Sequence, residues 1–238
     1  MSDFEQDVTG IGTLADPVRR ELYLYVCAQP GAVGRDEAAT AVGVAHHKAK
    51  FHLDRLEAEG LLVTEFARLT GRSGPGAGRP AKLYRRAERD ITVSLPGREY
   101  EMAGHIMADA IAESMKTGCA VGEALESAAA SRGRVLGAAA ASSIDSGDVL
   151  ADASRLLAGH GYEPRTEAAG PEPGDGQRVV MANCPFHSLT NSHSQLVCEM
   201  NHALLTGLAD SIAPGRLIAT LEPAVGRCCV VLREAPPA

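Results

Sequence analysis

The chain has 238 residues, enough for one large domain or for two modest domains that each bury a core. Hydrophobic residues make up 45% of it and charged residues 22%, a balance that argues against a disordered protein. The formal net charge is −7, so any contact with nucleic acid must come from a local concentration of cations. No apolar run approaches the roughly 18 residues of a membrane span, and the acidic N-terminus lacks the features of a signal peptide. We therefore expect a cytoplasmic protein without a membrane partner.

The first third of the chain has the pattern of three helices. A helix is expected to begin at Asp16-Pro17, because Asp caps free N–H groups and Pro at the first helical position loses no hydrogen bond. A short helix over 35–42, a turn at Gly43 and a longer helix over 45–59 follow. The apolar residues of the longer helix that we expect to pack inward are Phe51, Leu53 and Leu56. This order is typical of a helix-turn-helix, whose second helix enters the major groove of DNA.

A hairpin is predicted directly after these helices, with strands over 61–66 and 81–86. Seven basic residues and one acid lie between Arg68 and Arg89, which suits a localised contact with a polyanion but would also suit a solvated loop. Such a wing can place arginines on the DNA backbone or in the minor groove. The residues expected to contact DNA are His46, His47, Lys48, Lys50, Arg72, Arg79 and Lys82.

Three phrases of this region resemble the ArsR-type winged-helix repressors. They are LADPVRRELYLYV, AVGVAHHKAKFHLDRLEAEGLL and GRPAKLYRR. The likeness spans about residues 11–90 and implies a winged helix-turn-helix that binds double-stranded DNA. The alternative is a small helical domain that binds a protein instead.

From about Gly97 the pattern returns to a helix with a broad apolar stripe. The stripe consists of Tyr100, Met102, Ile106, Met107, Ala110, Ile111 and Met115. In winged-helix repressors such a helix packs against its copy in a second subunit, which presents two recognition helices to a symmetric operator; a core helix within one chain is the alternative. Residues 131–147 are expected to be a helix end and a linker, and Cys27 and Cys119 to be small buried residues without chemistry.

The remainder of the chain has the pattern of a small α+β domain. We expect helices over 149–160 and 194–212, and strands over 162–167, 178–183, 217–221 and 229–232. The predicted class is therefore α+β, in three parts. These are a winged helix-turn-helix domain over 1–95, a dimerisation helix and linker over 96–147, and a cysteine-bearing sensor domain over 148–238.

The sensor domain contains four of the six cysteines: Cys184, Cys198, Cys228 and Cys229. Six cysteines in a cytoplasmic chain of this length point to metal binding or redox chemistry rather than to a disulfide framework. His187 stands three residues after Cys184, a separation that lets both side chains meet one ion. Cys198 is expected in the first turn of the long helix, where the helix N-terminus lowers the pKa of a thiol. Adjacent strand residues point to opposite faces, so only one of Cys228 and Cys229 is expected to face the other cysteines.

A thiolate-rich site with a histidine suits zinc or an iron–sulfur cluster, and spacing does not choose between them because no C-x2-C pair is present. Two other interpretations are scattered buried cysteines, and an enzyme with Cys184 as nucleophile and His187 or His193 as base. No catalytic signature surrounds Cys184, so we expect no enzymatic activity.

The segments NCPFHSLTNSHSQLVCEMNHALLTGLA and LEPAVGRCCVVL resemble the sensor end of the SufR-type iron–sulfur repressors, and with the N-terminal part the likeness covers nearly the whole chain. It implies a homodimeric repressor of iron–sulfur cluster assembly genes that senses cluster or redox status through a 4Fe-4S or 2Fe-2S cluster. The alternative is a winged-helix repressor with a Cys/His zinc site or a thiol redox switch. In that likeness Cys184 and Cys198 match the first two ligands, and one of Cys228 and Cys229 matches the last. The candidates for the fourth ligand are His187, then His193, His202, the remaining cysteine, or an external thiol or water.

Overall fold

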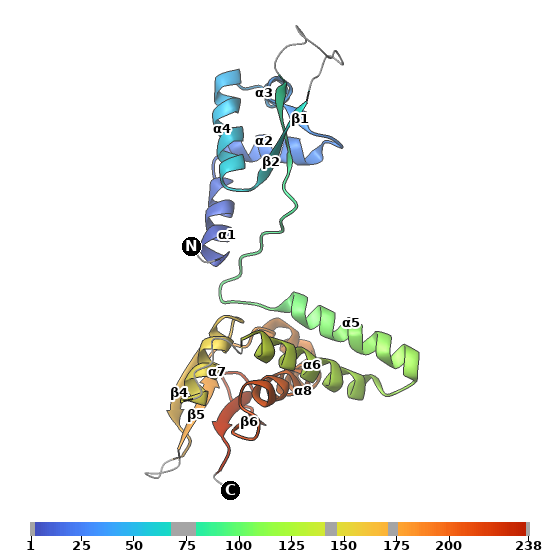
Figure 1. Cartoon of the computed structure of the whole chain (residues 1–238), viewed down its shortest axis with the longest axis vertical. Helices are drawn as coiled ribbons and strands as arrows, with labels where there is room; N and C mark the ends of the chain where they lie inside the picture. Colours follow the sequence, from blue (N-terminus) through green and yellow to red (C-terminus); the bar gives the residue numbers. More distant parts are fainter. Residues whose placement is uncertain (1–2, 68–79, 141–146, 171–175, 237–238) are drawn as a thin grey trace. The chain divides into compact units, whose positions relative to one another are not determined.

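The computed structural model describes residues 3–67, 80–140, 147–170 and 176–236, and the chain falls into two compact units (Figure 1). Unit 1 comprises Met1–Val93 and unit 2 comprises Ser94–Ala238. Both units combine helices with an antiparallel sheet, so the predicted α+β class is confirmed. Among the described residues, none of the helices combines the length and the apolar character needed to cross a membrane.

In unit 1, a group of helices packs with a small antiparallel sheet. The described elements are α1 (Asp3–Thr13), α2 (Pro17–Ala28), β1 (Val33–Gly34), α3 (Arg35–Val42), α4 (His46–Ala58), β2 (Leu62–Ala67) and β3 (Ala81–Arg86). The strands pair in the order β1-β3-β2, and the register places Leu62 opposite Arg86 and Ala67 opposite Ala81. Helices α2, α3 and α4 and strands β2 and β3 therefore lie within two residues of the predicted positions, whereas α1 and β1 were not predicted.

Local chemistry explains where the helices of unit 1 begin and end. The Asp16 carboxylate accepts a hydrogen bond of 2.9 Å from the backbone N–H of Arg19, and Pro17 occupies the first position of α2. Gly43 ends α3 with a φ of 71°, a conformation that glycine adopts without a steric penalty, so the chain can turn at once into α4.

The core of unit 1 corrects one prediction about α4. Leu53 and Leu56 are fully buried as expected, together with Leu22 of α2 and Tyr84 of β3. The side chain of Phe51 is 64% exposed, so the expectation that it packs inward was wrong. At 100° per residue, Phe51 lies on nearly the opposite side of the helix from Leu56, and the inward space next to it is filled by the buried His52 instead.

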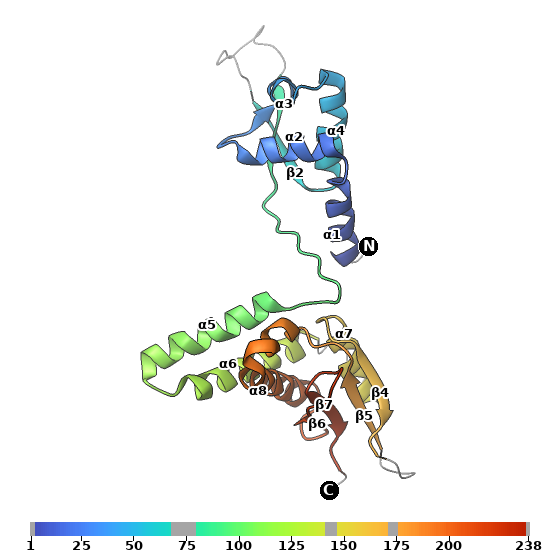
Figure 2. The same ribbon diagram turned by 180° about the vertical axis from the view of Figure 1, so that it is seen from behind.

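Unit 2 packs its helices with a four-stranded sheet (Figure 2). Its described helices are α5 (Tyr100–Thr117), α6 (Val121–Ala139), α7 (Val149–Ala158) and α8 (His187–Ile212). Its strands are β4 (Pro164–Ala168), β5 (Gln177–Met181), β6 (Leu217–Leu221) and β7 (Val230–Glu234), paired antiparallel in the order β4-β5-β7-β6. His193 interrupts α8 with non-helical angles, so the predicted start at 194 coincides with the helix after this kink.

The segment expected to be a separate dimerisation helix contributes to the core of unit 2. Met102 and Ile106 of α5 are buried there, whereas Ile111 and Met115 of the same stripe are exposed. Residues 131–139, expected to be a helix end and linker, are part of α6, and 141–146 lie outside the described residues. Alanine and glycine are abundant in 131–139 because this helix packs closely, not because the chain is a linker.

Helices α6 and α8 lie side by side at very short range (Figures 1 and 2). A Cβ atom added at Gly133 of α6 would lie 1.9 Å from the backbone oxygen of Leu204. One added at Gly207 of α8 would lie 2.0 Å from the backbone oxygen of Ala130. The two helices thus touch backbone to backbone, and only glycine at these positions permits that separation.

We expect Gly207→Ala to lower the free energy of unfolding by about 1–3 kcal/mol, because the added methyl group forces the two backbones apart. Gly104→Ala in α5 is the matched control: its Cβ would meet nothing within 4 Å, so alanine should be neutral or stabilise the helix slightly. Denaturant unfolding of both variants measures the difference. Equal stability of the two variants would contradict the close crossing.

Candidate functional site

Four cysteines from three separate segments meet in unit 2. Cys184 lies in the loop between β5 and α8, Cys198 lies on α8, and Cys228 and Cys229 directly precede β7. The thiol of Cys184 hydrogen-bonds with that of Cys228. The thiol of Cys228 also interacts with Cys229, and that of Cys229 with Cys198. The four side chains therefore form one continuous thiol group, the cysteine centre.

Both members of the Cys228–Cys229 pair belong to the cysteine centre, so the expectation that only one faces the other cysteines was wrong. The rule that adjacent side chains point to opposite faces applies within a strand. Strand β7 begins only at Val230, so the pair stands before the pleated region. The two thiols can then reach different neighbours, Cys184 on one side and Cys198 on the other.

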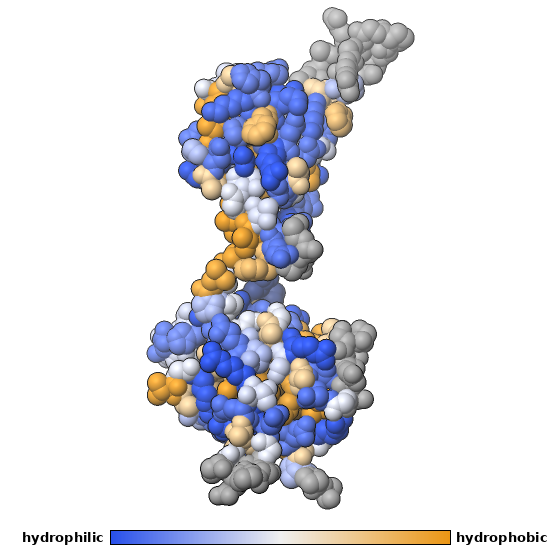
Figure 3. Space-filling model, turned by 90° about the vertical axis from the view of Figure 1, so that its left-hand side faces the viewer, coloured by the Kyte–Doolittle hydropathy of each residue, from blue (hydrophilic) through white to orange (hydrophobic). Residues whose placement is uncertain are grey.

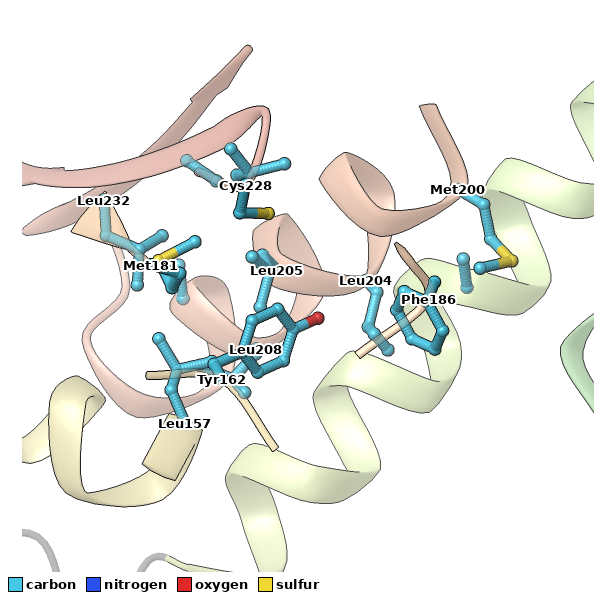
Figure 4. Close-up of a cluster of buried hydrophobic side chains, with 14 of the residues drawn as sticks. Leu157, Tyr162, Met181, Phe186, Met200, Leu204, Leu205, Leu208, Cys228 and Leu232 are labelled. Atoms are coloured by element: carbon cyan, nitrogen blue, oxygen red, sulfur yellow. The ribbon is translucent and has the colours of Figure 1, made fainter. Parts of the chain in front are cut away.

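Hydrogen bonds from α8 and the sheet hold Cys228 in place. Its backbone N–H donates to the carbonyl of Met181 at the end of β5, at 2.8 Å. Its sulfur accepts a hydrogen bond of 3.2 Å from the side-chain amide of Asn201 on α8. The Asn201 carbonyl oxygen in turn accepts from the buried hydroxyl of Tyr162, at 2.5 Å. Figure 4 shows Cys228 and Tyr162 within the buried cluster that also contains Met181 and Leu205.

A second network anchors the Cys184 loop to the first residues of unit 2. The Arg98 guanidinium donates to the side-chain oxygen of Asn183 at 2.5 Å and to the backbone oxygen of Cys184 at 3.0 Å. The Asn183 amide donates to the backbone oxygens of Gly97 and Gly161, at 3.1 and 2.6 Å. These contacts tie the Cys184 loop to the segment through which the chain enters unit 2, and we call them the Arg98–Asn183 anchor.

The surroundings of Cys184, Cys198 and Cys228 favour the neutral thiol. The hydrogen bond with Cys228, reinforced by burial, raises the pKa of Cys184 far above the ordinary value of a thiol. The hydrogen bond with Cys184 lowers the pKa of Cys228, but its contact with Cys229 and its burial outweigh this and raise it to about 11. Burial also raises the pKa of Cys198.

The expected lowering of the Cys198 pKa by a helix N-terminus was therefore wrong. Helix α8 begins at His187 and resumes after the kink at His193, so Cys198 does not lie in the first turn. The favourable field of a helix end is confined to that turn, and burial beside other thiols dominates at Cys198.

The histidines considered as ligands are either exposed or hydrogen-bonded elsewhere. The side chains of His187 and His193 are exposed, and the ring of His202 pairs with the backbone oxygen of Ala219 at 3.1 Å. In the described part of the chain, no group of three or more His, Cys, Asp or Glu side chains is arranged to hold a metal ion as it stands. The donors that the fold gathers are thus thiols alone, and soft metal centres prefer such donors.

The predicted DNA-contact residues divide into paired and unpaired groups in unit 1. On α4, His46 pairs with Asp36 at 2.5 Å and Lys50 with Asp54 at 2.8 Å. His47 and Lys48 are exposed, and neither forms an ion pair with a described acid. Arg72 and Arg79 lie outside the described residues.

Lys82 of β3 is held by acids of α4 rather than directed freely to solvent. It pairs with Asp54 at 3.2 Å and also with Glu57. Burial raises the pKa of Asp54, but hydrogen bonds from Tyr84 and two lysines outweigh this and hold it at about 2. The pairing fastens the hairpin to α4 and neutralises part of the positive charge of this face.

Sequence reasoning missed the polar residues that support the cysteine centre: Arg98, Asn183, Asn201 and Tyr162. Two of them had a usable signal. Asn183 directly precedes Cys184, and Asn201 follows Cys198 by three residues, which places it on a neighbouring position of the same helix face. Arg98 and Tyr162 reach the centre only through tertiary contacts.

The raised thiol pKa values predict that the reduced, metal-free protein loses stability at alkaline pH. Neutral thiols favour the fold fully below the ordinary thiol pKa of 9.0, and the gain is lost as pH rises from there through the value of about 11 at Cys228. We expect a loss of about 1–3 kcal/mol in the free energy of unfolding between pH 8 and 11, measured by denaturant titration. Cys228→Ala should flatten this dependence, and an unchanged slope in that variant would contradict the assignment.

Comparisons with known proteins yield no match to this chain among family models, curated proteins or solved structures. The resemblance seen in the sequence therefore stays an expectation. A function must be inferred from this chain's own residues, namely the cysteine centre of unit 2 and the exposed basic helix of unit 1.

Proposed function

We propose that this chain is a homodimeric DNA-binding transcriptional repressor that senses iron–sulfur cluster or redox status. Unit 1 is the winged helix-turn-helix, in which α4 is the recognition helix and the β2–β3 hairpin is the wing. Unit 2 is the sensor, and the cysteine centre holds the cluster. The observation that carries the proposal is the meeting of four thiols from three segments that are far apart in sequence.

The thiol group suits a bound metal centre better than a thiol switch. A thiol is reactive as a thiolate, and the surroundings of Cys184 and Cys228 disfavour that form. A metal centre supplies the positive charge that stabilises four thiolates, and its binding releases their protons. In a 4Fe-4S cluster each cysteine binds its own iron, and in a 2Fe-2S cluster two cysteines share each iron, so in neither case do the four sulfurs converge on one ion. Cys184, Cys198, Cys228 and Cys229 are the residues that would hold the cluster, and the exposed His187 is not needed as the fourth ligand.

The support for DNA binding comes from the exposed surface of α4. His47 and Lys48 are available in its first turn, where the residues of a recognition helix meet base edges and phosphates. The strong pairing of Lys82 with Asp54 and Glu57 gives that lysine a structural role in holding the wing against the recognition helix. A homodimer would present two such helices to a palindromic operator.

The Arg98–Asn183 anchor offers a path from the sensor to the DNA-binding unit. Binding of a cluster must move the neutral, hydrogen-bonded thiols, and the Cys184 loop moves with its own thiol. Arg98 donates a hydrogen bond to the backbone of that loop. The backbone N–H of Glu99 also donates to the loop, at the carbonyl of Pro185, over 3.2 Å. A displacement of the loop is therefore passed to the segment that leads to unit 1.

Anaerobic purification tests the proposal. We expect iron and acid-labile sulfide in the isolated protein, and selection from random duplexes should yield a specific DNA sequence. Cys184→Ser and Cys198→Ser should lose iron, whereas Cys27→Ser and Cys119→Ser, which lie outside the cysteine centre, should keep it. Zinc without iron would favour a zinc site in the same centre. Protein without either metal, or without any DNA selectivity, would contradict the proposal.

Arg98→Gln should uncouple the two units without emptying the centre. In the native protein, we expect loaded and metal-free forms to differ in affinity for the selected duplex by about 5–150-fold, the usual range of such coupling. In Arg98→Gln that ratio should approach one while the iron content is retained. Arg165→Gln, an exposed arginine of β4, is the control and should keep the native ratio. A native ratio in Arg98→Gln would exclude the anchor as the path.

A further inference from the structure

The outward face of α4 carries one large apolar side chain. Phe51 is 64% exposed, whereas the inward face of the helix is closed by the buried Leu53 and Leu56. Its ring is not loose, because it meets the ring of His52 edge-on with 5.3 Å between centroids and 71° between planes. Burial of His52 in the core of unit 1 thus holds the Phe51 ring in a defined outward position.

The neighbours of Phe51 show what kind of surface it can meet. At 100° per residue, His47 lies one turn before it on the same stripe. Lys48 and Lys50 lie on the two flanks, and both are exposed. On the face of unit 1 seen in Figure 3, hydrophilic side chains predominate in the centre, with hydrophobic ones among them and at the edge. A protein partner or a membrane would require a contiguous apolar patch, which this stripe does not offer.

We propose that Phe51 is a specificity-determining residue that contacts the C5-methyl group of a thymine in the major groove. The inference rests on the proposed DNA-binding function. The thymine methyl is the one apolar group that a base pair displays in the major groove, and Phe is among the side chains that read it. The ring of Phe51 can meet one thymine methyl group while the lysines on its two flanks meet the neighbouring phosphates. His47, one turn away, faces the neighbouring base pair.

Replacement of thymine by deoxyuridine tests this contact, because it removes the methyl group alone. A specific duplex is first obtained by selection from random DNA, and each thymine is then replaced in turn. For the native protein we expect affinity to fall about fourfold at one or two positions in each half-site, the effect of losing one buried methyl. For Phe51→Ala we expect the loss at those positions to shrink to less than about 1.5-fold. Phe51→Leu, which keeps an apolar side chain, should retain part of it.

Phe4→Ala is the matched control, since Phe4 is 51% exposed but lies on α1, outside the helices and the hairpin proposed to meet DNA. This variant should keep the native response to deoxyuridine. If the native protein binds no duplex, the proposed function itself fails and the inference falls with it. If the protein binds a specific duplex and Phe51→Ala keeps the full response to deoxyuridine, only the thymine contact is overturned. A response that is lost equally in Phe4→Ala would also overturn it.

Discussion

The contact between α6 and α8 is the constraint on which the organisation of unit 2 depends. Gly133 and Gly207 let the two backbones meet, and any side chain at either position would push the helices apart. Helix α8 carries Cys198 and Asn201, so its depth in the unit decides where these side chains stand relative to the segment before β7. A helix held by backbone contact cannot slide or tilt without losing its whole interface, and this rigidity lets cysteines from distant segments face one another reproducibly.

Burial of the cysteine centre disfavours thiolate anions, and a bound cation would be needed to stabilise them. Uncharged thiols satisfy one another by weak hydrogen bonds, with Asn201 as an added donor to Cys228. Four thiolates in the same space would repel each other strongly, and the positive charge of Arg98, which lowers the pKa of Cys184, is outweighed there by the hydrogen bond with Cys228 and by burial. The structure shows the protonated thiol group, and the proposed function adds a second, deprotonated form in which a metal centre would bind the thiolates. Arg98 bonds to Asn183 and to the backbone oxygen of Cys184, so a change in the thiols of the centre would be felt by the backbone of the Cys184 loop.

On α4 of unit 1, charged side chains are paired on one side of the helix and, among the described residues, unpaired on another. Acids on the side of the hairpin, Asp54 and Glu57, hold Lys82 and leave the wing attached to the helix. The outward stripe keeps His47, Lys48 and Phe51 without such partners, so its chemistry remains available for a ligand. Helix α4 thus has one face that holds the hairpin and another that is exposed to solvent, although its overall sequence is a simple mixture of basic, acidic and apolar residues.

Periodicity and capping residues determined most of the local structure. Asp16-Pro17, Gly43 and the hydrophobic repeats were sufficient to predict α2, α3, α4 and the hairpin, because these signals act within a few residues. The same reasoning failed for Phe51, whose inward space is taken by His52, and for 131–139, where small residues mark close packing rather than a linker.

The sequence by itself determined that cysteines are concentrated at the end of the chain and basic residues at the hairpin. Only the tertiary structure decided that Cys228 and Cys229 both join Cys184 and Cys198, that His202 is hydrogen-bonded to the backbone of Ala219, and that Lys82 is paired. The physical reason is that a thiol's partner and its pKa depend on burial and on side chains brought in from distant segments. The spacing of residues along the chain does not reveal those contacts.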